Sequence, residues 1–170
     1  QKGGNETLKP LLAPVSGGET KEGEGNTTTE GKDENKDESV VEVPEEALDF
    51  NNGVIKGIKT TWLTKNKGKS LKVVIPAEIG DTPVTSIGSN AFNRKNIAEI
   101  DFDTAENLTE IGNQAFMHCE KLTSVDLSNT KVTAIGKFAF SDCKALQDIV
   151  LPDTLKTLGD GNKNDPAGSV

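Results

Sequence analysis

The stretch IGNQAFMHCEKLTSVDL, residues 111–127, decides the fold because its pattern recurs at a fixed distance on both sides. The motif Ile-Gly-x-x-Ala-Phe that opens it at Ile111 also begins 24 residues earlier, at Ile87, and 24 residues later, at Ile135. A weaker copy, Leu-Gly, begins at Leu158. A fixed period in this range is typical of stacked repeats, in which each unit forms one coil and the coils bury a shared core.

Each repeat continues with the spacing L-x-x-V/I-x-L/F. Residues two apart point to the same face of a strand, so we expect one strand per coil with its apolar positions turned inward. A second apolar pair follows, and then the glycine, which we expect in left-handed geometry at the corner. Ala-Phe should lie on a short helical or 3₁₀ turn, which places Phe92, Phe116 and Phe140 in one buried column. The first repeat is one residue shorter between Phe92 and its strand, and regains that residue before Leu108.

The string I-G-x-x-A-F-x-x-C-x-x-L-x-x-V-x-L-P resembles the bacterial BspA-type (Treponema pallidum-type) leucine-rich repeat, and residues 73–88 resemble the entry into its first repeat. The resemblance spans residues 50–159. It implies a right-handed leucine-rich-repeat solenoid that is horseshoe-like and β-rich, with short helical or 3₁₀ turns; the residues before the repeats predict an N-terminal β-meander cap. It also implies a bacterial protein that is secreted or held at the cell surface, with a lipid anchor as one mode of attachment. Members of the family are associated with adhesion to host or matrix proteins, and the family supplies no catalytic residues.

We predict four parts in the chain, the first of which stands out by its composition. Residues 1–49 hold 13 acidic residues and 5 lysines, whereas residues 50–170 are balanced at 14 each, so the net charge of −8 belongs to the leading segment. High charge with low hydrophobicity disfavours a packed core. We therefore predict a flexible acidic linker over residues 1–38, a β cap over 39–76 that leads into the first strand, repeats of about 24 residues over 77–159, and a tail over 160–170.

The cap should contain two hairpins. Residues 47–58 read as a hairpin around the turn Asn52-Gly53, and residues 60–64 with 71–75 read as a second one. Residues 40–43 would add a strand, and Trp62 should belong to the core of the cap because Trp buries a large area. At the other end, residues after Leu158 lack the Ala-Phe motif. We expect that end to continue into further domains, to be loosely covered, or to support end-to-end self-association.

Several classes of function lack their signatures. The balanced charge of residues 50–170 gives no basic stripe for nucleic acid, and no apolar run has the length of a membrane span. His118, the single histidine, falls at an outward turn position, so no nucleophile–base pair can be assembled and we expect no enzyme, metal or cofactor. Cys119 and Cys143 share one repeat position. We interpret them as buried reduced thiols, with a disulfide as the alternative.

The outward positions of the strand column are the candidate site. They form two rows across successive coils, acidic in the middle, and Asp101 and Asp126 should lie side by side on hydrogen-bonded neighbouring strands. One hypothesis is that this face binds a protein or other macromolecule, as repeat proteins do with such surfaces. The alternatives are a solvated sheet face and a structural spacer that binds nothing. The candidate partner-binding residues are Lys72, Glu99, Asp101, Asp103, Ser124, Asp126 and Asp148.

Overall fold

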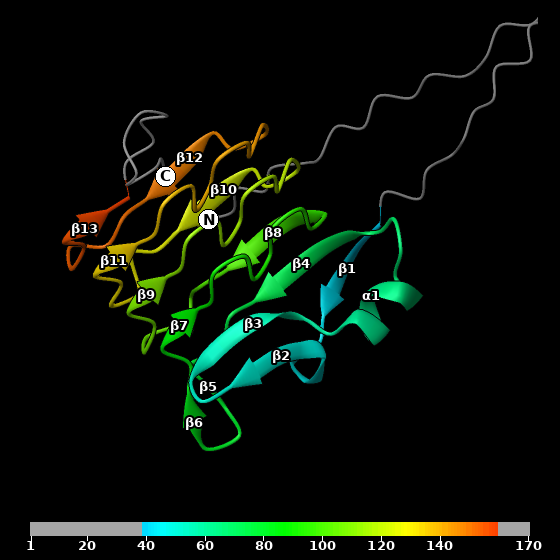
Figure 1. Cartoon of the computed structure of the whole chain (residues 1–170), viewed down its shortest axis with the longest axis horizontal. Coiled ribbons are helices and arrows are strands. Elements are labelled where there is room, and N and C mark those ends of the chain that lie inside the picture. Colours follow the sequence, from blue (N-terminus) through cyan, green and yellow to red (C-terminus); the bar gives the residue numbers. More distant parts are fainter. Residues whose placement is uncertain (1–38, 160–170) are drawn as a thin grey trace, which may run out of the picture. The chain divides into compact units, whose positions relative to one another are not determined.

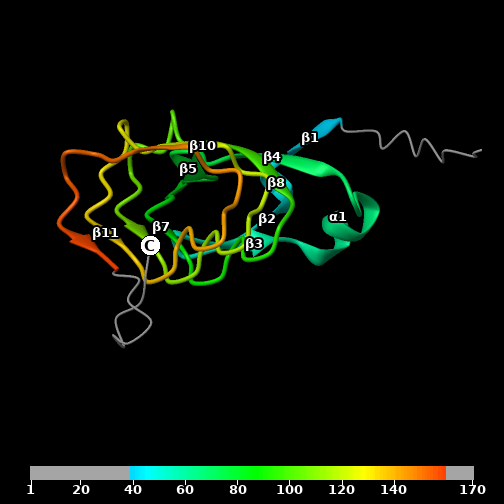
Figure 2. The same cartoon turned by 90° about the horizontal axis from the view of Figure 1, so that it is seen from above.

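The computed structural model describes residues 39–159, which coil into a solenoid with two columns of short strands (Figures 1 and 2). These residues belong to the second of two units into which the chain separates, Lys36–Val170. The first column contains a sheet of β1 (Val40–Val43), β4 (Ser70–Val74) and β8 (Ile97–Asp101), and a separate pair, β10 (Ser124–Asp126) and β12 (Asp148–Val150). All neighbours within these two sheets are parallel.

The second column is one six-stranded sheet. Its order is β13 (Thr157–Leu158), β11 (Ala134–Ile135), β9 (Glu110–Ile111), β7 (Ser86–Ile87), β3 (Val54–Ile58) and β2 (Leu48–Asn51). Only β2 runs antiparallel to its neighbour. A small hairpin of β5 (Glu78–Ile79) and β6 (Thr82–Pro83) stands apart from both columns. The arrangement confirms the predicted leucine-rich-repeat solenoid.

The predicted phenylalanine column forms the centre of the core. The rings of Phe92 and Phe116 stack with centroids 5.2 Å apart, and those of Phe116 and Phe140 stack at 5.2 Å with an interplanar angle of 2°. Phe102, from the end of β8, meets Phe116 edge-on at 6.4 Å. All four side chains are buried. Each coil therefore contributes one ring to a continuous aromatic stack, which no single coil could bury alone.

The repeated glycine is required for a different reason from the predicted one. Gly112 and Gly136 are not left-handed; instead, a Cβ at Gly136 would lie 2.5 Å from the backbone nitrogen of Asn113 in the preceding coil. Glycine is needed because two backbones approach closely. The left-handed positions follow two and six residues later, and non-glycine residues occupy them. These are Asn90, Gln114 and Phe138, and then Arg94, His118 and Asp142, with φ between 56° and 61°.

The cap is only partly as predicted. The hairpin of β2 and β3 forms around Asn52 and Gly53, both with positive φ, and β1 is the additional strand. The prediction of a second hairpin is wrong, because residues 60–65 form the helix α1 (Thr60–Lys65) and β4 pairs in parallel with β1 and β8. The β-branched side chains of residues 60–65 favour a strand, but this segment crosses from one strand column to the other. Trp62 of α1 is half-buried and packs against the core. A 3₁₀ turn, η1 (Glu45–Ala47), connects β1 to β2.

Burial is incomplete in the last described coil. Ile149, Leu151 and Leu158 occupy core positions of the repeat and are 41%, 43% and 48% exposed, whereas their counterparts one coil earlier are buried. The predicted linker over residues 1–38 and the predicted tail over 160–170 lie outside the described residues. The boundaries of the four parts stay predictions.

Candidate interaction surface on the strand column

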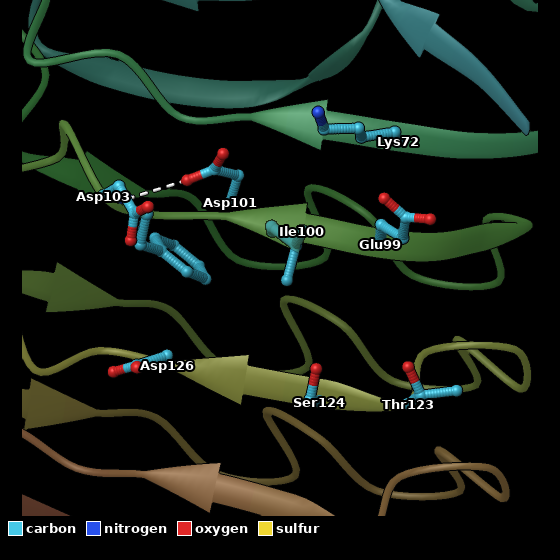
Figure 3. Close-up of a pocket in the computed structure, with 9 residues that line it drawn as sticks. Lys72, Glu99, Ile100, Asp101, Asp103, Thr123, Ser124 and Asp126 are labelled. Carbon is cyan, nitrogen blue, oxygen red and sulfur yellow. Dashed lines mark hydrogen bonds between the residues drawn. The ribbon is translucent and has the colours of Figure 1, made fainter. Parts of the chain in front are cut away.

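A groove of about 510 Å³ opens on the outward side of β4, β8 and β10, which we call the strand face (Figure 3). Six of the seven candidate residues line it, and the seventh, Asp148 on β12, does not. The six are Lys72, Glu99, Asp101, Asp103, Ser124 and Asp126. The alternation of inward and outward side chains along a strand, together with the stacking of coils, brings residues far apart in the chain to one place.

The two predicted rows form within each sheet of the first column. Lys72 pairs with Glu99 across β4 and β8, and Ser124 pairs with Asp148 across β10 and β12. The rows are interrupted between β8 and β10. Among residues 39–159 no ladder joins these strands, so Asp101 and Asp126 flank the groove instead of facing each other across a hydrogen-bonded pair as predicted.

The interruption coincides with the irregular spacing of the first repeat. Between Phe92 and Ile97 the chain has one residue fewer than between Phe116 and Leu122, so β8 enters its column earlier than β10 does. After β8, the hydroxyl of Thr104 donates to the carbonyl oxygen of Ile75, which binds the following loop to the preceding coil. The groove therefore opens where one repeat is out of phase with the next.

Sequence reasoning missed the apolar and hydroxyl groups of the groove. Ile100 of β8 and Phe102, the residue after that strand, line the groove, as does Thr123, the residue before β10. Phe102 is buried and Ile100 is half-buried. The shortened spacing in the first repeat was the signal that could have indicated a gap at this level. The groove thus combines an apolar wall with a charged rim, an arrangement common in protein-binding surfaces.

Carboxylates dominate the rim of the groove. Four carboxyl side chains line it against one ammonium group, that of Lys72, which lies 3.2 Å from Glu42 on β1. The hydrogen bond from Lys72 to Glu42 and the attraction of that carboxylate raise the pKa of Lys72. The positive charge is thereby partly neutralised from outside the groove, so the strand face is best suited to a cationic or hydrogen-bond-donating surface.

Two of the carboxylates are held by short turns. Asp101 accepts a hydrogen bond from the backbone N–H of Asp103, and Asp126 accepts one from the N–H of Ser128, both at 2.9 Å. The hydroxyl and the N–H of Ser128 together lower the pKa of Asp126. These hydrogen bonds fix the orientation of both aspartates, and the lowered pKa of Asp126 favours its charged form.

The two cysteines, the other residues with reactive side chains that the sequence singled out, have a structural role. Cys119 and Cys143 are buried free thiols, as interpreted from the sequence, and their Sγ atoms donate to the carbonyl oxygens of Phe92 and Phe116 at 3.2 and 3.1 Å. Burial raises the pKa of Cys119 to about 12. In residues 39–159, no group of three or more His, Cys, Asp or Glu side chains is placed to hold a metal ion. None of the helices in this part of the chain has the length and apolar character to cross a membrane.

Comparison with known proteins agrees with the geometry. The sequence model of the BspA type leucine rich repeat region, with six copies, matches residues 69–162. Comparisons with curated proteins and with solved structures gave no match. The matched residues include every strand from β4 to β13 and more than half of the chain, and this type of solenoid is typical of protein-interaction and surface modules. The chain belongs to the BspA-type leucine-rich repeat family.

Proposed function

We propose that this protein is a non-enzymatic cell-surface or secreted protein that binds a macromolecular partner, most simply a protein, through the strand face. The observation that carries the proposal is the groove between β8 and β10, which interrupts an otherwise regular solenoid and gathers six outward side chains. A regular sheet face would need polar side chains only to remain solvated. A groove with a partly buried apolar wall and oriented carboxylates offers contact area and specificity as well.

The charge of the strand face suggests the partner's chemistry. Because the rim is acidic, a partner surface rich in lysine, arginine or hydrogen-bond donors would be attracted to it. Such attraction mainly accelerates encounter and is weakened by salt. Contacts with the half-buried Ile100 would then help to set the rate of dissociation.

The family supports the proposed location. BspA-type repeats are generally found in bacterial surface proteins, so we place the chain outside the bacterial cell or at its surface, with lipid anchoring as one mode of attachment. Adhesion to host or matrix proteins is the corresponding role.

The experiment compares two matched double variants. Asp101→Asn with Asp126→Asn removes two charges from the strand face, and Asp81→Asn with Glu110→Gln removes two exposed charges elsewhere. The parent chain is immobilised and partners are captured from host-matrix and bacterial-surface extracts. Each captured protein is then titrated against purified parent and variants at low and physiological salt.

We expect the strand-face variant to lose roughly three- to tenfold in affinity at low salt, and the control variant to bind like the parent. Equal binding by both variants would reject the strand face as the interface. It would also favour the second candidate, a structural spacer whose strand face is merely solvated.

End-to-end association is a further proposal for the same chain. The apolar side chains exposed on β12 and β13, above all Ile149 and Leu158, support it, because exposed core positions favour contact with another apolar surface. Sedimentation over a range of protein concentrations tests it. The variant Ile149→Ser with Leu158→Ser should remain monomeric where the parent associates, and a parent that sediments as a monomer throughout would reject it.

A further inference from the structure

The only arginine and the only histidine of the chain line the same pocket. Arg94 and His118 are 24 residues apart, occupy the same position in successive coils, and share a pocket of about 260 Å³ with Lys95, Asn96 and Glu120. This pocket, which we call the turn pocket, lies at the Ala-Phe turns, and none of its residues lines the strand-face groove. Binding at the turn pocket can therefore be tested with variants that leave the strand face unchanged.

The backbone sets the two side chains beside each other. Both residues are left-handed, with φ of 57° at Arg94 and 58° at His118. The N–H of Arg94 donates to the carbonyl oxygen of Met117 at 2.8 Å, which joins the turn of one coil to the turn of the next. Left-handed residues recur at this position in each coil, so this geometry belongs to the fold. What distinguishes the first two coils is the chemistry of the side chains placed there.

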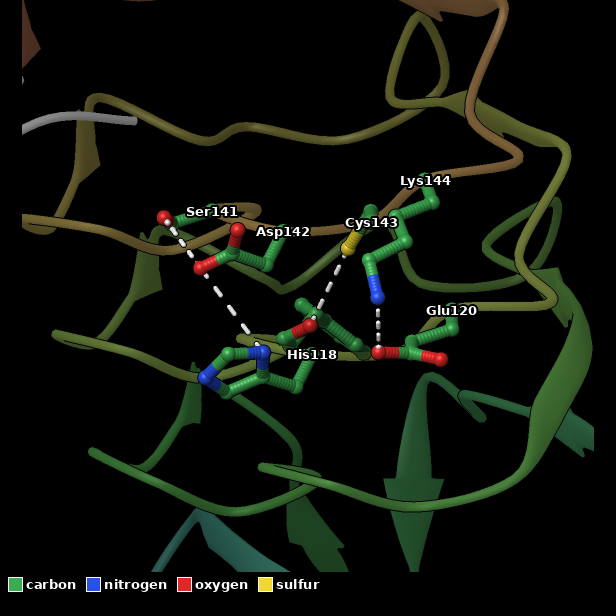
Figure 4. A network of polar contacts seen from close by, with 7 residues as sticks. His118, Glu120, Ser141, Asp142, Cys143 and Lys144 are labelled. Atoms are coloured by element: carbon green, nitrogen blue, oxygen red, sulfur yellow. Dashed lines mark hydrogen bonds and ion pairs between the residues drawn. The ribbon is translucent and has the colours of Figure 1, made fainter.

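Among the residues that the structure describes, the two cations that line the turn pocket have no ion-pair partner, whereas its one carboxylate is paired. Within residues 39–159 the side chains of Arg94 and Lys95 form no ion pair and no hydrogen bond. Glu120 is paired with Lys144 at 2.7 Å, and this interaction lowers the pKa of Glu120 (Figure 4).

The neighbouring carboxylate of Asp142 is also occupied. It accepts a hydrogen bond from the hydroxyl of Ser141 at 3.3 Å and lies 3.7 Å from Nδ1 of His118. Three cations thus face two carboxylates around the turn pocket, before any charge on His118 is counted. The local balance is positive on a chain whose net charge is −8.

We propose that the turn pocket binds a tetrahedral oxyanion, a sulfate or phosphate group carried on a larger molecule. The guanidinium of Arg94 offers a planar fork of donors, and the ammonium of Lys95 adds a point charge beside it. His118 projects from the next coil and supplies a third donor. A planar carboxylate is satisfied by one arginine fork, whereas a tetrahedral group has oxygens left for donors from a second coil. The volume of the pocket leaves room for the atoms that carry the anion.

The test is an NMR titration of the full chain with sodium sulfate, sodium phosphate and sodium acetate, each against sodium chloride at equal ionic strength. We expect saturable shifts at Arg94, Lys95 and His118 with sulfate, phosphate or both, and a Kd on the order of millimolar, which corresponds to about −4 kcal/mol. Whichever of sulfate and phosphate binds more tightly identifies the group that the pocket takes. Acetate should bind at least fivefold more weakly, and equal binding of acetate would overturn the tetrahedral assignment.

Three variants locate the site. Arg94→Gln should weaken binding at least fivefold, and Gln is compatible with this backbone because Gln114 is left-handed in the same solenoid. Glu120→Gln should strengthen binding at least twofold, since it removes a carboxylate and frees Lys144. Lys156→Gln removes an exposed charge from another part of the solenoid and should bind like the parent.

Two outcomes would overturn the proposal. One is a set of shifts that rise linearly without saturation or spread over lysines across the surface. The other is equal binding by Arg94→Gln and Lys156→Gln. If Arg94→Gln proved unfolded by circular dichroism, Lys95→Gln would take its place with the same expected loss, and an unchanged affinity in that variant would reject the site.

Discussion

Replacing Phe116 by Ala removes the middle ring of the aromatic column and leaves a cavity with walls on both sides. Phe116 is fully buried, stacks on a ring above and a ring below at 5.2 Å, and meets Phe102 edge-on. Phe→Ala in a core costs about 3–5 kcal/mol, and stacked pairs contribute roughly 0.5–1.5 kcal/mol each beyond their buried area. We therefore expect a loss near the upper end, about 5 kcal/mol, comparable to the whole stability of a small domain.

Urea denaturation followed by far-ultraviolet circular dichroism and by Trp62 fluorescence measures the loss. Trp62 is the only tryptophan and lies in α1, so it reports on the cap while circular dichroism reports on the strands. With a urea dependence of about 2 kcal/mol per molar, the midpoint should fall by roughly 2.5 M. Coincident transitions of the two signals would show that cap and repeats unfold together.

Phe140→Ala is the matched control for position in the stack. Within residues 39–159 Phe140 has a stacked neighbour on one side only, and it is 6% exposed, so its replacement should cost less than that of Phe116, by about 1 kcal/mol or more. Equal losses in the two variants, or an unchanged midpoint for Phe116→Ala, would refute the account of the coil interior.

Three further predictions concern single groups. Gly136→Ala should cost roughly 1–3 kcal/mol in urea denaturation because the new Cβ meets atoms of the preceding coil at 2.5 Å; an unchanged midpoint would contradict the close spacing. Asp126 should titrate below the usual pKa of about 3.9 in carboxyl-carbon NMR, and Ser128→Ala should raise its pKa. Because the folded pKa is the lower one, this stabilisation is present above the unfolded pKa and is lost as pH falls through the folded value. Cys119, with a pKa of about 12, should resist a disulfide reagent at pH 8 until urea unfolds the chain, and rapid labelling of the native protein would place this thiol at the surface.

The repeat period determined most of what could be predicted. Stacking at a constant spacing follows from the apolar positions alone, which is why the column of Phe92, Phe116 and Phe140 was correct, as were the inward strand positions Val125 and Leu127 of the middle repeat. The cap has no repeat to constrain it. Residues 60–65 have strand-like composition, yet they cross from β3 in one column to β4 in the other as a helix, and local propensity does not contain this tertiary context.

Backbone geometry at the turns was also beyond the sequence pattern. A glycine that recurs in every repeat suggests positive φ, yet Gly136 is required because two backbones come close together. The left-handed positions are filled by residues as different as Arg94 and Phe138. Backbone hydrogen bonds from these turns to the next coil stabilise the geometry; the N–H of His118, for example, donates to the carbonyl oxygen of Ser141 at 2.8 Å. Left-handed backbone in a non-glycine residue costs about 1 kcal/mol or more, and a regular row of intercoil hydrogen bonds offsets that cost.

The candidate site depends on the departure from the repeat more than on the repeat itself. Identical coils would continue the ladder from β8 to β10 and leave the strand face flat, with Asp101 and Asp126 opposed at the spacing of paired strands. The residue missing between Phe92 and Ile97 coincides with the interruption of the ladder, and the groove opens there. Inserting one residue after Lys95 should therefore restore the pairing and close the groove. If the strand face binds its partner through this groove, that insertion should weaken binding even though every charge on the rim is kept, and this outcome would separate the shape of the site from its charge.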